Sequence, residues 1–162
     1  MIEKLKSAGA VVIGFLIFVV ALLAIGLLIG GAGWVSERLL PWFSVASLIA
    51  LLVIVFILLP LSAFRTTRGF AALVIMYLSF LFGVTVWMEG LLTTLSIWGT
   101  GAVVFGLFLG GVGVVPIAML ATLFHGLWGR LGELIGLVVI TFGCRFFALW
   151  IASKADAAGY AD

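Results

Sequence analysis

Long uninterrupted runs of apolar side chains are the feature that most constrains this sequence. A helix needs about 20 apolar residues to cross the hydrocarbon core of a bilayer, and several runs of that length follow one another here. Backbone polar groups inside lipid must bond within the protein, which leaves helices or closed barrels. Barrel strands alternate polar and apolar residues, and these runs do not alternate. The sequence therefore predicts an all-α, polytopic transmembrane helix bundle.

The runs predict about five membrane-spanning helices with short loops in a single transmembrane domain, residues 1–162. We expect helices at residues 8–31, 43–63, 70–88, 99–124 and 131–152, followed by a frayed tail at residues 153–162. Charged residues make up 9% of the chain, against about 25% in a soluble domain. So little charge could not cover a soluble surface.

The first apolar run resembles a secretory signal, because lysines precede it and small residues follow it. A cleavable signal has an apolar core of about 7–15 residues, whereas this run extends from Ala8 to Ile29. We therefore expect a retained helix, with cleavage after Ala32 as the alternative.

Lysine and arginine in short loops predict the orientation, because cytoplasmic loops carry an excess of them. With five crossings, one side holds Lys4, Lys6, Arg65, Arg68 and Arg130, and the other holds Arg38 and Lys154. We expect a cytoplasmic N-terminus and an outer C-terminus, in a bacterial inner membrane. All six tryptophans lie near expected helix ends, which suits residues that favour the membrane interface.

Glycine is abundant, with 21 residues, and glycines spaced four apart let membrane helices approach closely. The candidate helix-packing residues are Gly26, Gly30, Gly106, Gly110, Gly132, Gly136 and Gly143. In the last span, glycines occupy one face, while Thr141, Arg145 and Ala148 occupy the opposite face. We expect this helix to lie between neighbours and Gly132 and Gly136 to contact another helix closely; scattered glycine is the alternative.

The fourth expected span contains a helix-breaking segment. Gly110, Gly111, Gly113 and Pro116 fall within one or two turns, and proline removes a backbone donor and kinks a helix. Broken helices line substrate or ion sites in many transporters, but they also occur as plain packing kinks.

Two charges are expected at membrane depth, where charged residues are costly and suggest function. Arg145 lies inside the last span, and Glu89 lies at the end of the third. A polar stripe accompanies them: Thr85, Thr93, Ser96 and Thr141. We expect a Glu89–Arg145 ion pair; the alternative is that Arg145 reaches outward to the lipid headgroups.

The chain offers little for catalysis or cofactor binding. His125 is the one histidine, and we interpret it, with Arg130 and Glu133, as a structural cluster at a helix end. A histidine alone supports neither a catalytic triad nor a metal or haem site. We expect no enzyme activity, no cofactor and no metal, and the dispersed net charge of +2 argues against nucleic acid.

Two functions remain after these exclusions. Short loops and glycine-rich helix faces favour an accessory or scaffold subunit that packs in the lipid bilayer against other membrane subunits or a second copy of itself. The alternative is a homo-oligomeric channel or transporter for a small solute or ion, which the broken helix and the polar stripe favour.

Overall fold

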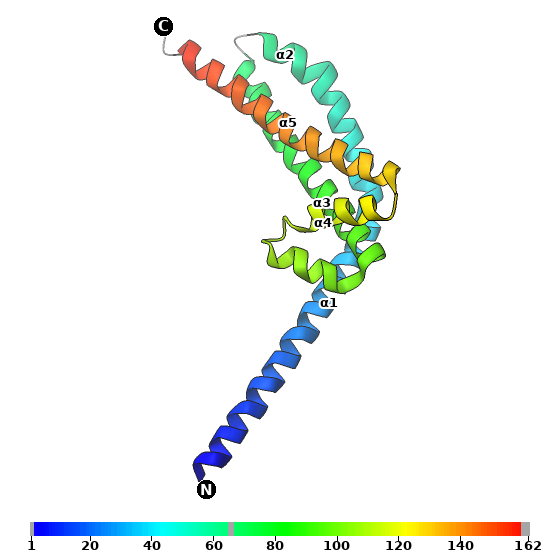
Figure 1. The fold of residues 1–162 in the computed structure, drawn as a ribbon. Helices are drawn as coiled ribbons and strands as arrows, with labels where there is room; N and C mark the ends of the chain where they lie inside the picture. The colour runs from blue at the N-terminus through cyan, green and yellow to red at the C-terminus, as the bar shows by residue number, and fades with distance from the viewer. Residues whose placement is uncertain (1, 65–66, 160–162) are drawn as a thin grey trace.

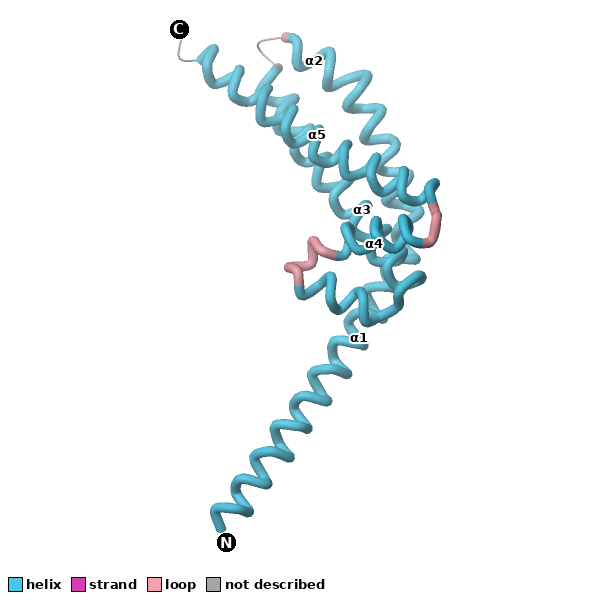
Figure 2. The backbone as a smooth tube through the Cα atoms, in the orientation of Figure 1, coloured by secondary structure: helices cyan, strands magenta, loops and turns pink. Residues whose placement is uncertain are grey.

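The computed structural model describes the backbone of residues 2–64 and 67–159, and the side chains of 16–64 and 67–154 except residue 22. Most of this part of the chain is helical. In chain order the elements are α1 (Ile2–Val53), the π-helical segment η1 (Ile54–Leu58), α2 (Leu59–Ala63), α3 (Arg68–Phe108), α4 (Val114–Phe124) and α5 (Trp128–Gly159) (Figure 1). Figure 2 shows the loops between them, at residues 109–113 and 125–127 among others. The all-α class is confirmed.

α1, η1 and α2 follow one another as a continuous helical rod. The loop expected at residues 33–41 is absent, because α1 passes through it with Pro41 inside the helix. Pro60 has no N–H to donate to the helix ladder, and the ladder takes the π form just before it, where the Leu59 N–H bonds the Ile54 carbonyl. The first part of α1, residues 2–24, projects away from the other helices and is called the arm below (Figure 1).

α3 also extends through an expected connection. Residues 89–98, which we expected to join two spans, are helical. The helix kinks at Gly99, whose φ of 74° lies in the left-handed region that favours glycine. The second part of α3 and the short helix α4 then form a hairpin, residues 100–124, around the loop at 109–113.

The core lies where α1, α3 and α5 pack side by side, and α3 is antiparallel to both neighbours. Between α3 and α5 the contacts run in opposite directions: Arg145 bonds Ser79, Thr141 lies near Gly83, and Leu134 packs with Val86. Between α1 and α3, the buried Ser47 and Thr85 hydroxyls are 2.9 Å apart. The largest apolar cluster joins all three helices around Phe82 and Ile75.

Three stretches are long and apolar enough to cross a membrane: Leu16–Ala63, Arg68–Phe108 and Trp128–Lys154. α4, with 11 residues, is about 16 Å long at 1.5 Å per residue, roughly half the hydrocarbon core. The described residues do not form five separate membrane-length helices, because α1 joins the first two expected spans and α3 joins the third to part of the fourth. α5 contains the fifth and extends beyond it to Gly159.

Candidate functional site

A polar cavity of about 470 Å³ lies where α1, α3 and α5 meet. Three helices each contribute a carboxylate to its wall: Glu37 from α1, Glu89 from α3 and Glu133 from α5. The rest of the lining is Leu40, Leu92, Thr93, Leu95, Ser96 and Arg130. It is the most concentrated group of charged side chains in the described part of the chain.

One wall of the cavity forms because α3 is an unbroken helix through residues 89–96. Glu89, Thr93 and Ser96 are spaced four and three apart, so on an unbroken helix they lie on one face. The first turns of α5 then place Arg130 and Glu133 opposite this face, because α5 runs back along α3. Of the α3 residues that the sequence grouped as a polar stripe, Glu89, Thr93 and Ser96 line this cavity and Thr85 does not. The sequence assigned Arg130 and Glu133 to a separate structural cluster.

The charges in the cavity do not neutralise one another by direct contact. Arg130 forms no ion pair with Glu37, Glu89 or Glu133 in the part of the chain that the structure describes. Nor do the described histidine, cysteine and acidic side chains include a group of three placed to hold a metal ion. The cavity therefore carries a formal excess of negative charge, three carboxylates against one guanidinium.

Arg145 lies elsewhere, so the expected Glu89–Arg145 ion pair is not formed. Its Nε atom donates to the Ser79 hydroxyl at 3.3 Å, and its guanidinium lies 4.9 Å from the Phe80 ring centre and 5.8 Å from that of Phe142. Glu89 is ten positions from Ser79 along α3, about 15 Å away. The pairing assumed that the two helices run in the same direction, whereas they are antiparallel.

This arrangement predicts that Glu89→Ala and Arg145→Ala destabilise the protein independently. Their combined effect on the free energy of unfolding in detergent should equal the sum within about 0.5 kcal/mol, as for distant sites. The matched cycle of Arg145→Ala with Ser79→Ala should show coupling of about 0.5–1.5 kcal/mol, because that pair shares a hydrogen bond. Coupling in the first cycle and additivity in the second would contradict the structure.

The remaining polar residues of the expected stripe bond within the bundle. The Thr85 hydroxyl donates to the Leu81 carbonyl and meets Ser47, while the Thr141 hydroxyl donates to the Leu137 carbonyl. Ser47 and Ser79, two polar partners that the sequence did not single out, are small residues inside apolar runs. The serine type alone gave no sign of their contacts.

The expected helix break at Gly110, Gly111, Gly113 and Pro116 is the loop of the hairpin. Gly110 and Gly111 have φ values of 78° and 75°, which other residues rarely adopt. Pro116 lies in the first turn of α4, where a missing N–H costs no helical bond. Two α3 side chains attach this region: Trp87 Nε1 donates to the Gly111 carbonyl at 3.0 Å, and the Thr94 hydroxyl donates to Val114 at 3.3 Å.

The glycines fall into two groups, those in close contact with another part of the chain and those with open space beside them. Inside the chain, a Cβ on Gly106 would lie 3.0 Å from the Val114 backbone, and one on Gly90 would lie 3.2 Å from Val115. The other candidate packing glycines have nothing within 4 Å of such a Cβ: Gly26, Gly30, Gly110, Gly132, Gly136 and Gly143. The close helix contact expected at Gly132 and Gly136 is thus not made within the described chain, because α3 covers the opposite face of α5.

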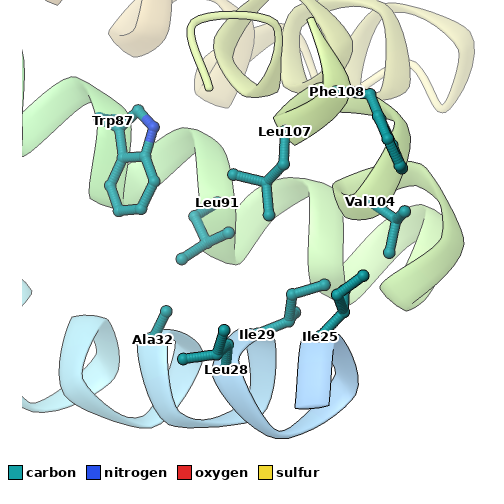
Figure 3. A pocket seen from close by; sticks show the side chains of 9 residues that line it. All are labelled: Ile25, Leu28, Ile29, Ala32, Trp87, Leu91, Val104, Leu107 and Phe108. Atoms are coloured by element: carbon teal, nitrogen blue, oxygen red, sulfur yellow. The ribbon is translucent and has the colours of Figure 1, made fainter. Parts of the chain in front are cut away.

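An apolar groove of about 420 Å³ lies between α1 and the hairpin. Figure 3 shows Ile25, Leu28, Ile29 and Ala32 of α1 pointing toward Trp87, Leu91, Val104, Leu107 and Phe108 of α3. None of its described lining residues is charged, so the groove offers an apolar surface without groups for acid–base chemistry or ion binding.

His125 and Cys144 lie outside the polar cavity. His125 is exposed at the end of α4, where its Nδ1 atom is 2.9 Å from the carbonyl of Ala121 in its own helix. Cys144 is half-buried and free.

Comparisons with protein-family models, with curated proteins and with solved structures find no match to this chain.

Proposed function

We propose that the chain is an accessory or scaffold subunit that packs against other helices in a membrane. The observation that carries this proposal is that two glycine faces are open: Gly26 and Gly30 on α1, and Gly132, Gly136 and Gly143 on α5. Such faces allow helix backbones to approach closely where lipid provides no hydrophobic drive for association. Because the chain does not fill them itself, they are available to a partner subunit or to a second copy.

The arm supports the same proposal. Its described side chains are largely exposed, Leu16, Phe18 and Leu23 among them. The stretch from Leu16 to Ala63 has 48 residues, about 70 Å of helix, whereas the hydrocarbon core is about 30 Å thick. A straight rod would carry apolar surface beyond the bilayer. Ile29 and Gly33 pack against α3, so the rod stays unbroken through Ser36. The bend that we propose lies at the end of the arm, before Ile25, and it returns the arm to the membrane beside its partner.

The proposed topology has four crossings, with the hairpin entering and leaving on one side. The antiparallel packing of α3 and α5 supports it, because α5 then starts on the side where α3 ends. Both termini are cytoplasmic in this arrangement, in a bacterial inner membrane. The five crossings expected from the sequence are the alternative, and they put the C-terminus outside.

We further propose that the chain is not an enzyme and needs no cofactor. Its single histidine lies next to a carbonyl of its own helix, so it is not positioned by a neighbouring carboxylate as a general base would be. A homo-oligomeric channel or transporter is the second candidate function. The polar cavity favours it, since rings of carboxylates select cations in known pores.

The accessory proposal predicts that Gly136→Leu removes partners without unfolding the chain. A Cβ there has nothing of the described chain within 4 Å, but a leucine would hold a neighbouring helix away. The experiment is purification from native membranes in mild detergent, with bound proteins identified by mass spectrometry and the chain's thermal unfolding measured alongside. Gly101→Leu is the matched control, because Gly101 is also open but lies on neither glycine face.

We expect the variant to lose co-purifying subunits, or its self-association, while its unfolding temperature stays within a few degrees of the parent. The control should keep both. Recovery of the same partners with Gly136→Leu and with the matching Gly30→Leu change would reject the accessory proposal. A symmetric oligomer that persists and conducts ions would favour the channel.

A further inference from the structure

The polar cavity between α1, α3 and α5 has an unbalanced charge. Its wall carries Glu37, Glu89 and Glu133 against Arg130 alone, and the described residues supply no ion pair to these carboxylates. Like charges brought together on three helices repel one another, and either a proton or a bound cation relieves that repulsion. A positively charged ligand is therefore favoured here over a neutral one of the same shape.

The Thr93 hydroxyl is a second, independent indication of a ligand. Thr93 lines the cavity although only 2% of its surface is exposed, and its hydroxyl has no hydrogen-bond partner among the described residues. Fully enclosed side-chain oxygens and nitrogens in the described part all have partners. Because Thr93 lines the cavity, its free hydroxyl is available to a molecule that enters this space.

The lining selects the class of cation. The described acidic groups are not close enough together to form a metal site, and a volume of about 470 Å³ is far larger than a bare ion requires. A quaternary ammonium group is bound through aromatic faces, and the described lining residues include no aromatic ring. A primary ammonium group has three N–H donors, which match carboxylates and a hydroxyl. Leu40, Leu92 and Leu95 then offer an apolar surface to its carbon body.

We propose that this cavity binds a primary ammonium group carried on a small organic body. Glu89 and Glu133 accept hydrogen bonds from the ammonium, together with Thr93, while Glu37 closes the α1 side. The same chemistry occurs in a soluble alkylamine and in the headgroup of phosphatidylethanolamine, whose phosphate would meet Arg130. This site does not depend on the accessory function, since it is built within one chain.

The test uses the full chain purified in detergent, with n-propylammonium as the probe and tetramethylammonium as a control of equal charge without N–H donors. We expect propylammonium to bind saturably by calorimetry and tetramethylammonium to bind at least tenfold more weakly. Glu89→Gln should weaken propylammonium binding about tenfold or more, because a charge-assisted bond is lost. Thr93→Val should weaken it severalfold, and Thr100→Val, an exposed threonine outside the cavity, should not.

Glu37→Gln provides a second variant at the exposed rim in case Glu89→Gln fails to fold. A separate arm places the chain in nanodiscs of phosphatidylethanolamine or of phosphatidylcholine and measures thermal unfolding. Stabilisation by phosphatidylethanolamine that Glu37→Gln abolishes identifies the lipid as the source; binding of the soluble amine alone identifies a free solute. Absence of both, or equal binding of propylammonium and tetramethylammonium, overturns the proposal.

Discussion

Replacement of Gly106 by leucine is expected to push the two helices of the hairpin apart and to destabilise the protein by about 1–3 kcal/mol. A Cβ at this position would lie 3.0 Å from the nitrogen and the Cα of Val114, and backbone atoms cannot move aside as a flexible side chain can. Val114 is fully buried against Ile29 and Leu91, so the disturbance should spread to α1. Unfolding in detergent, followed by circular dichroism, measures the loss.

Gly101→Leu is the control for this substitution. Gly101 lies in the same helical segment, but a Cβ there has nothing within 4 Å, and leucine favours a helix over glycine by up to about 1 kcal/mol. The control should leave stability unchanged or raise it slightly. Equal unfolding of the two variants would mean that the 106–114 contact does not hold the hairpin.

The topology proposal predicts a complete change in labelling, because a site is either accessible or protected. In a Cys144→Ser background, single cysteines at Thr67 and Ser153 should both resist a membrane-impermeant maleimide in intact cells and react after lysis. The physical reason is that antiparallel α3 and α5 bring the end of α5 beside the start of α3, as the shared cluster of Ala71 and Ile151 indicates.

A cysteine at Leu127, in the loop before α5, is the positive control and should react in intact cells. Leu127 is exposed, and in the proposed arrangement it lies on the outer side. Five crossings give the opposite pattern for Ser153 and Leu127, since the C-terminus would then be outside. Labelling of Ser153 but not Leu127 in intact cells would restore the five-crossing arrangement.

The sequence could not distinguish these topologies, because both satisfy its orientation signal equally. With five crossings Arg130 is cytoplasmic and Lys154 is outside, whereas with four crossings these two residues change sides. Both arrangements therefore place five lysines and arginines in the cytoplasm and two outside. Hydropathy does not reveal the hairpin either, because residues 100–124 are apolar enough to be interpreted as a membrane-spanning helix. The hairpin depends on tertiary contacts: Gly106 packs on Val114, and the Trp87 side chain donates to the Gly111 carbonyl. Neither contact produces a periodic pattern in the sequence.

Only part of the candidate site could be predicted from the sequence, because the rest depends on tertiary contacts. Helical spacing grouped Glu89 with Thr93 and Ser96, which line one cavity in the structure, because that grouping depends only on the local helix. The partners from α1 and α5 depend on which way each helix runs and on the register between them. An error in direction therefore paired Glu89 with Arg145 and placed Glu133 in a separate structural cluster.

The shortness of the hairpin has a consequence for the lipid around the protein. In the proposed topology α3 and α5 take up area in both leaflets, whereas α4, about 16 Å long, reaches only to the bilayer midplane. The protein then has a wedge-shaped cross-section, broader in the outer leaflet. Such a shape fits best where the outer leaflet is stretched, so the chain should concentrate in membrane that bulges outward.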